Sequence, residues 1–330
     1  MMIERILISV ATVILPVIWV ANVVSANEEA SMKHVQPISD EAPKFFSIDY
    51  EKARAKFRDA ATVAGARIES YKHPTTGPMG APIYTDVAVL GSSDAEAVLF
   101  VGAGTHGVEG FAGSAIQTGL LRRGFGSRLS SNTRLVLIHA INPFGFAYLR
   151  RANEDNIDVN RNFRDHAQPY PPNPGYDALA DAIAPDSISV LSDIAAISRL
   201  ICYAAGNGIG ATTAAISSGQ YTHPKGLFFG GESEAWSVKT LRTIVQRHGN
   251  GARKVAFVDV HTGLGPYGHG EIILNVPEAA SSYERAFAWW GERVKTTKAG
   301  KSVSADLTGT LKLAIPKMLP GAEVTAVSLE

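Results

Sequence analysis

The sequence predicts an α/β protein with a mixed, mostly parallel, twisted sheet and helices on both of its faces. Short apolar runs, among them Val98–Val101 and Val255–Val260, have the length and composition of buried strands. Amphipathic segments lie between them, and in Gly110–Arg123 the apolar residues share one helical face. Strands that alternate with helices are typical of a largely parallel sheet that is covered on both sides.

The other elements follow from the same two periodicities. Turn residues separate them, as in Gly91–Asp94, and the polar stretch Ala152–Gly175 is expected to be a structured loop. In chain order we predict helices over Ile48–Ala64, Gly110–Arg123, Asp177–Tyr203 and Ser281–Val294, and strands over Thr85–Leu90, Val98–Val101, Arg134–Ala140, Val255–Val260, Glu271–Val276 and Ala322–Leu329.

Composition narrows the class of protein. The 330 residues include 31 Lys and Arg against 31 Asp and Glu, so we expect no nucleic-acid partner, which usually needs a basic excess. A hydrophobic share of 45% is enough to build a sizeable core. The single cysteine, Cys202, lies in an apolar stretch and is expected in the core. A short arginine cluster is expected at a solvated helix end and loop: Arg122, Arg123, Arg128 and Arg134.

The N-terminus has the pattern of an export segment. Ile6–Val24 is almost entirely apolar, and the small residues around Ser25 fit a signal-peptidase site after Ala26. The run is also just long enough for a retained membrane anchor, so membrane contact through residues 6–24 is an alternative. Residues 27–43 are expected to be a linker and residues 44–330 the globular domain. Either reading places that domain outside the cytoplasm, in the periplasm or beyond.

The first candidate for chemistry is a His and a Glu that stand three positions apart. His106 and Glu109 lie in a glycine-rich turn between a predicted strand and a predicted helix. At that spacing the two side chains can point the same way, and an imidazole nitrogen with a carboxylate oxygen suits zinc. The pair alone is weak evidence for a zinc site, because the same spacing occurs by chance in many proteins.

The second candidate is His261, which ends the apolar run Val255–Val260. A catalytic zinc commonly takes three protein ligands and leaves one position open for water. His261 lies 152 positions after Glu109 (261 − 109), so only the fold can bring them together. Asp259 is a candidate to fix the imidazole from behind, although strand alternation leaves its direction open.

The third candidate is the polar stretch from Arg150 to Phe163, which follows a buried strand. It contains four asparagines and three arginines among other polar residues. Arginine side chains bind carboxylates in a bidentate manner and stabilise a developing oxyanion. The alternative is a loop whose Asn and Asp side chains bond only to its own backbone.

Taken in order, these three segments resemble the zinc carboxypeptidase superfamily, which includes the aspartoacylase and succinylglutamate desuccinylase branch. The likeness covers roughly residues 84–330 and is greatest to an uncharacterised bacterial branch. It implies a carboxypeptidase-like fold and a hydrolytic Zn²⁺ site with His106, Glu109 and His261 as ligands. It further implies that Asn160 and Arg161 hold a substrate carboxylate. Arg151, with Arg150 as the alternative, matches the arginine that polarises the scissile carbonyl.

The same resemblance implies a glutamate general base on a late strand. Glu330, the last residue of the sequence, is its match, and relatives continue beyond this point, so the chain looks truncated at its C-terminus. Glu271 is the alternative base. The implied reaction is amide hydrolysis in a small peptide or an N-acyl amino acid. His269 is a candidate for substrate contact, because it follows His261 in a glycine-rich loop.

Two other functions remain open on the sequence. Gly102–Gly107 matches Gly-x-Gly-x-x-Gly after a strand and before a helix, a pattern typical of dinucleotide binding. That function also requires an acidic residue about 20 positions further on, yet none occurs between Glu109 and Glu154. The second alternative is a non-catalytic relative that binds zinc or a ligand and hydrolyses nothing.

Overall fold

The computed structural model describes residues 41–187, 189–266, 268–300, 302, 304 and 307–330. Within them, eight strands form one sheet in the order β1-β2-β4-β3-β5-β8-β6-β7. The strands are β1 (Arg67–Thr76), β2 (Pro82–Leu90), β3 (Ala97–Ala103), β4 (Thr133–His139), β5 (Lys254–Val260), β6 (Ile272–Leu274), β7 (Val294–Thr296) and β8 (Glu323–Leu329).

The centre of the sheet is parallel and its flanks are mixed. β3 pairs in parallel with β4 and β5, and β5 pairs in parallel with β8. The pairs β1 with β2, β2 with β4 and β6 with β8 are antiparallel. In register, Ala103 lies beside Val260, and Val260 lies beside Leu329. The segments that follow these three residues therefore leave the sheet at the same edge, where ligands of parallel α/β sheets bind.

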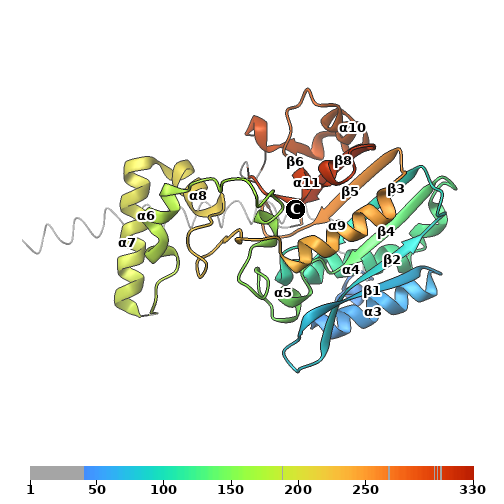
Figure 1. Cartoon of the computed structure of the whole chain (residues 1–330), viewed down its shortest axis with the longest axis horizontal. Coiled ribbons are helices and arrows are strands. Elements are labelled where there is room, and N and C mark those ends of the chain that lie inside the picture. Colours follow the sequence, from blue (N-terminus) through green and yellow to red (C-terminus); the bar gives the residue numbers. More distant parts are fainter. Residues whose placement is uncertain (1–40, 188, 267, 301, 303, 305–306) are drawn as a thin grey trace, which may run out of the picture.

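Helices cover both faces of this sheet, as predicted (Figure 1). Alternate residues of each strand point to opposite faces. Phe100 belongs to the core under α9 (Trp236–Gly249) and α11 (Leu311–Met318), and Val101 to the core under α3 (Tyr50–Val63). The other helices are α2 (Ala42–Phe45), α4 (Gly110–Arg122), α5 (Pro143–Ala147), α6 (Pro174–Ile183), α7 (Val190–Asn207), α8 (Ile209–Ser217) and α10 (Ser281–Trp290).

Two predicted helices differ from the observed ones. The segment predicted as a single helix over Asp177–Tyr203 is two helices, α6 and α7. Pro185 follows α6, where it disfavours the α conformation of Ala184, and Ser189 then caps α7 in a capping box. The helix predicted over Ser281–Val294 ends at Trp290, because Gly291 has a positive φ of 60°.

Seven helices and strands were not predicted, namely β1, β7, α2, α5, α8, α9 and α11. Two side chains lie elsewhere than predicted. Cys202 is exposed rather than in the core, because α7 buries none of its residues. Arg134 is buried rather than solvated, and its guanidinium donates to the carbonyls of Ser92, Ser93 and His248.

The predicted export segment and most of the predicted linker, residues 1–40, lie outside the described residues. The end of that linker contains α2, which begins at Ala42. Among the described helices, none has the length and apolarity required to cross a membrane.

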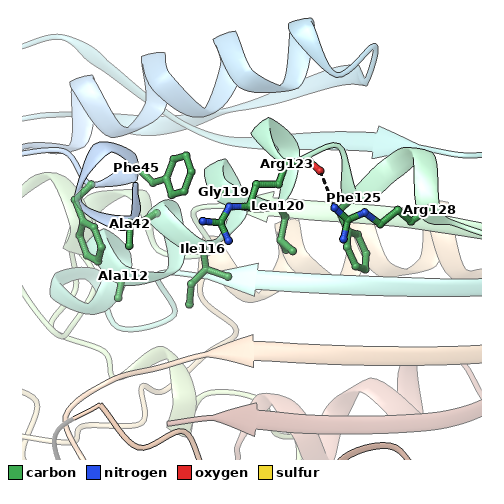
Figure 2. Close-up of a pocket in the computed structure, with 11 residues that line it drawn as sticks. Ala42, Phe45, Ala112, Ile116, Gly119, Leu120, Arg123, Phe125 and Arg128 are labelled. Carbon is green, nitrogen blue, oxygen red and sulfur yellow. Dashed lines mark hydrogen bonds between the residues drawn. The ribbon is translucent and has the colours of Figure 1, made fainter. Parts of the chain in front are cut away.

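α2 packs across the outer face of α4. The ring of Phe45 lies over Gly119, where a Cβ atom would approach the ring to 3.1 Å. Beside this contact, a largely apolar cavity of about 530 Å³ lies along α4 toward Phe125 (Figure 2). Arg123 and Arg128 stand at its edge, and Arg128 donates to the carbonyl of Arg123. This cavity is on the face of the molecule that carries α3 and α4, away from the residues that follow β3, β5 and β8.

Candidate metal and substrate site

The three predicted metal ligands meet at the carboxyl edge of the sheet. His106 precedes a 3-10 turn, Gly107–Glu109, that leads into α4, and His261 follows β5. Nδ1 of His106 lies 2.8 Å from Oε1 of Glu109, and Nδ1 of His261 lies 2.9 Å from Oε2 of the same carboxylate. One potential ligand atom from each residue lies within 4.8 Å of the others. The fold thus unites two segments that are far apart in the sequence.

The outward nitrogens of both imidazoles contact carboxylates. Nε2 of His106 lies 3.2 Å from Oδ1 of Asp158, and Nε2 of His261 lies 2.6 Å from Oδ2 of Asp259. Thr105 donates to the other oxygen of Asp259 at 2.7 Å. Each ring is therefore held so that Nδ1 faces the centre of the group, as is typical of metal-ligating histidines.

The direction of the Asp259 side chain was open on the sequence, and Asp158 had no predicted role. Residues two apart on a strand share a face, which is why Asp259 reaches the ring of His261. Asp158 opens the Asp-Val-Asn-Arg-Asn-Phe segment, and its side chain also caps that turn through the N–H of Asn160. The sequence feature that could have identified Asp158 is its place at the start of this polar motif.

Electrostatics holds these groups in a charged state. Burial opposes ionisation of Glu109, but the adjacent imidazoles outweigh it and keep the pKa of Glu109 well below its usual value. Burial likewise opposes the charge of Asp158, yet Arg151 and Arg161 hold its pKa far below normal. The pKa of His261 is raised well above normal, because Asp259 and Glu109 outweigh its burial. With its pKa raised, His261 holds a proton, and a metal ion bound between His261 and Glu109 would displace that proton.

The donor set fits zinc. Two imidazole nitrogens and one carboxylate are a common set for catalytic zinc, which keeps a further position for water. The orientation of the side chains supports this fit. Both Nδ1 atoms face the two oxygens of Glu109, while the Nε2 atoms contact Asp158 and Asp259. His106, Glu109 and His261 would hold the ion.

A cavity of about 420 Å³ adjoins this group. His106, Glu109 and the side chains proposed for substrate and proton transfer line it, together with residues of α8 and α11. The structure thus brings together Arg151, Asn160, Arg161 and Glu330, which sequence analysis selected. Arg150 and His269 are not among the described residues that line the cavity. Arg150 is exposed and donates to the side chain of Asn156.

The two arginines of the cavity have different surroundings. Arg151 donates from Nε to Asp158 at 3.0 Å and keeps a side chain that is 38% exposed, so its remaining nitrogens can reach a ligand. Arg161 is buried, and donates to the carbonyls of Asn160 and Ser217 at 2.9 and 2.6 Å. Among the described residues, its Nε has no hydrogen-bond partner. Burial lowers the pKa of Arg161 although Asp158 opposes this.

Phe228, which was not predicted from the sequence, has its ring against both guanidinium groups. The ring centroid is 5.1 Å from the Cζ of Arg151 and 5.7 Å from that of Arg161. Phe228 has a φ of 55°, which is uncommon outside glycine and costs conformational energy. No local pattern around Phe228 marks it, because its ring contacts arginines that are more than sixty positions away.

The polar loop predicted between Arg150 and Phe163 serves two purposes. Asn153 and Asn162 bond to backbone groups, and Asn162 joins the loop to Gly230 and Ser233. This self-bonded architecture was the alternative considered from the sequence. It holds Arg151 and Asp158 toward the metal group, so the loop is both a scaffold and a wall of the site.

Glu330 follows the last residue of β8, as His261 follows the last residue of the neighbouring β5, so both leave the sheet at the same edge. Its backbone exchanges two hydrogen bonds with Glu271, each of 3.0 Å. Its side chain lines the cavity, and Oε2 is buried with no hydrogen-bond partner in the part of the chain that the structure describes. Burial raises the pKa of Glu330, and the nearby His261 only partly offsets this. The alternative base, Glu271, instead accepts a hydrogen bond from Ser302 at 2.7 Å.

The glycines of the Gly-x-Gly-x-x-Gly segment are used for packing. A Cβ atom on Gly107 would lie 1.9 Å from the backbone carbon of Gly145 in α5. A Cβ on Gly102 would lie 2.8 Å from the side chain of Ile141. The backbone that a dinucleotide phosphate would approach is therefore already covered by the chain itself.

Known structures share this fold. Carboxypeptidase A from Helicoverpa armigera is 13% identical, with a TM-score of 0.50 over 85% of this chain and 64% of that one. Thrombin activatable fibrinolysis inhibitor is 12% identical, with a TM-score of 0.50 over 92% and 71%. A succinylglutamate desuccinylase/aspartoacylase from Rhodobacter sphaeroides is 14% identical, with a TM-score of 0.39 over 80% and 57%. This chain thus spans less than two thirds of the length of the Helicoverpa armigera carboxypeptidase A.

The two likenesses with a TM-score of 0.50 define the fold class, an α/β protein with the zinc carboxypeptidase-like fold, as the sequence motifs predicted. Within that class, the chain belongs to the family described as protein of unknown function (DUF2817), whose model matches residues 46–330. A comparison with curated proteins found no match.

Proposed function

We propose that this protein is a zinc-dependent hydrolase that cleaves an amide bond in a carboxylate-bearing substrate. The observation that carries the proposal is the convergence of His106, Glu109 and His261, with both Nδ1 atoms turned inward. Two carboxylates fix the rings from behind. The group opens into a cavity at the sheet edge where such folds bind ligands. The carboxypeptidase-like fold supports the same assignment.

Each residue of the cavity has a distinct role in this proposal. A bound zinc ion would lower the pKa of a coordinated water and polarise the substrate carbonyl. Glu330 would accept the proton of the attacking water and pass it to the leaving amine. Its raised pKa, caused by burial, brings it closer to the neutral range in which such transfer is efficient. Arg151 would stabilise the negative charge that develops on the carbonyl oxygen.

The substrate class follows from the other polar groups. Arg161 and Asn160 line the cavity beside Arg151, and guanidinium groups bind carboxylates well. A small peptide with a free C-terminus and an N-acyl amino acid both carry a carboxylate near the scissile amide. We therefore propose this pair of substrate types. We further propose export to the periplasm or beyond, on the basis of Ile6–Val24 and the small residues before Asn27.

The test is hydrolysis by the zinc-loaded protein of a panel of dipeptides and N-acyl amino acids, measured as amine released. We expect turnover of at least one carboxylate-bearing compound and none of its methyl ester. Glu330→Gln should lower kcat by about 10²- to 10⁴-fold and leave zinc bound. Glu323→Gln, on the same strand and exposed, is the matched control and should be unaffected.

The outcomes separate the proposal from its alternatives. Loss of activity in Glu271→Gln but not in Glu330→Gln would transfer the role of base to Glu271. Zinc bound at one ion per chain without turnover of any compound in the panel would favour the non-catalytic relative. Binding of a dinucleotide would instead support a ligand site in the glycine segment, against the packing described above.

A further inference from the structure

α7 has an apolar face that the other described residues do not cover. α6, α7 and α8 lie together to one side of the sheet, with α7 at the outer edge (Figure 1). Although α7 has 18 residues, none of them is buried. Five of its six large aliphatic side chains are exposed, to different extents: Val190 75%, Leu191 80%, Ile194 56%, Ile197 56% and Ile201 43%. We call these five residues the α7 stripe. Contiguous exposed apolar surface of this kind is typical of an interaction site.

The spacing of the stripe indicates what shape of partner it fits. Val190, Ile194, Ile197 and Ile201 are separated by four, three and four residues. Side chains at this spacing form a nearly straight seam along a helix, and such a seam packs against another helix at a shallow angle. Leu191 widens the seam on one side. The fitting partner is therefore a second apolar helix of similar length.

The charges of α7 indicate which kinds of partner the stripe can bind. Asp193 and Arg199 are its only charged residues. Arg199 is turned toward α6, where it donates to the carbonyl of Ala178 at 3.0 Å and lies 3.8 Å from Asp181. The stripe itself has no charge that would select a charged partner. The helix also lacks the lysine- and arginine-rich polar face of helices that bind membrane surfaces.

We propose that the α7 stripe is covered by α7 of a second copy of this chain, in a two-fold symmetric helix pair. Full cover of the five exposed side chains would bury on the order of 600 Å² per chain, or roughly 1,200 Å² for two copies, against the about 1,000 Å² expected of a specific interface. An uncharged, self-complementary patch suits a symmetric pair, the commonest arrangement of homo-oligomers.

The pair would also stabilise one wall of the cavity at the candidate site. α8 packs beside α7 and supplies Thr213 and Ser217 to the cavity lining. The carbonyl of Ser217 accepts the hydrogen bond from Arg161. Burial of the α7 stripe would therefore fix the helices that hold the buried arginine, although the proposed interface does not depend on the proposed hydrolase activity.

The test is the mass of the full purified chain in solution, measured by sedimentation equilibrium from about 1 to 100 μM. We compare wild type with Ile194→Glu/Ile197→Glu, which adds charge to the centre of the stripe at exposed, helix-compatible positions. Val63→Glu/Met79→Glu adds the same charges at side chains that are 69% and 87% exposed on other elements. Far-UV circular dichroism and zinc content verify that each variant is folded.

Wild type and the control variant should have twice the mass of one chain at the upper concentrations, and the α7 variant the mass of a single chain. A wild type that remains a single chain at 100 μM would overturn the proposal. So would an α7 variant that pairs as tightly as wild type. If the single-chain wild type instead sediments with vesicles of phosphatidylethanolamine and phosphatidylglycerol and the α7 variant does not, the stripe is a membrane-binding surface.

Discussion

At the scale of single residues, the candidate site is defined by which nitrogen of each imidazole is left free. Asp158 and Asp259 engage the two Nε2 atoms, and this leaves both Nδ1 atoms for an ion. The carboxylates also raise the basicity of the rings, which strengthens metal binding. The positions of His106 and His261 alone would not ensure this orientation.

Removal of either carboxylate should therefore weaken metal binding without destroying the ligand set. For Asp158→Asn and for Asp259→Asn we expect zinc affinity to fall by about 10- to 100-fold, as measured by competition with a chelator of known affinity. Asp59→Asn, whose side chain is 65% exposed and far from the site, is the control. An unchanged affinity in both variants would show that the carboxylates do not orient the ligands.

Residue types and their order predicted the ligands, but not the residues that support them. His106, Glu109 and His261 are conspicuous because each follows or begins a predictable element. Phe228 could not be found in this way, since its role depends on a positive φ and on two distant arginines. Arg150 and Arg151 could not be separated by sequence, because only the turn of the loop decides which of them faces Asp158.

At the scale of elements, the apolar runs that are buried in the sheet were predictable and the edge strands were not. β3, β4 and β5 are short apolar runs. β1 is an edge strand with a single buried residue, His73, so its sequence lacks the apolar alternation on which the prediction rests. α9 was missed although Val238, Leu241 and Val245 follow a helical period, so that signal was present.

The contact between β4 and the helices α3 and α4 includes a buried histidine that should make stability depend on pH. His139 stacks on Phe57 and lies 2.9 Å from the hydroxyl of Ser114. Burial lowers the pKa of His139 from 6.5 to about 4. The unfolded chain therefore binds a proton at this residue below pH 6.5, whereas the folded chain does not until the pH nears 4.

The free energy of unfolding should consequently decrease as the pH falls through this window, by an amount on the order of 3 kcal/mol for this residue. His139→Gln cannot titrate but can still bond to Ser114. We expect urea denaturation between pH 7 and pH 4.5 to show a smaller decrease in the variant than in wild type. Equal slopes would mean that His139 is not the titrating group.

The packing of the glycine segment Gly102–Gly107 against neighbouring elements leads to a second prediction about stability. Gly107→Ala places a Cβ against the backbone of α5, and backbone cannot move aside as a flexible side chain can. We expect a loss of roughly 2–4 kcal/mol in the free energy of unfolding and weaker zinc binding, because His106 is adjacent. In Gly206→Ala, where no atom lies within 4 Å, stability should be unchanged or increase by about 0.5–1 kcal/mol. Equal stability of Gly107→Ala and wild type would contradict this packing.

At the scale of the whole molecule, the parallel centre of the sheet creates the site. Ala103, Val260 and Leu329 lie in register, so the segments that follow β3, β5 and β8 bring His106, His261 and Glu330 to one place. The alternation of strands and helices predicted this edge. Which strands pair antiparallel could not be predicted, nor could the separate group of α6, α7 and α8, since both depend on pairings between distant segments.

The central claim is that His106, Glu109 and His261 form one zinc site, and metal content tests it most directly. Elemental analysis of the purified wild-type chain should give about one zinc ion per chain, and His106→Ala/His261→Ala should contain none while it remains folded. A folded wild-type protein that takes up no metal when zinc is supplied would contradict the claim, and so would a double variant that retains a full equivalent of zinc.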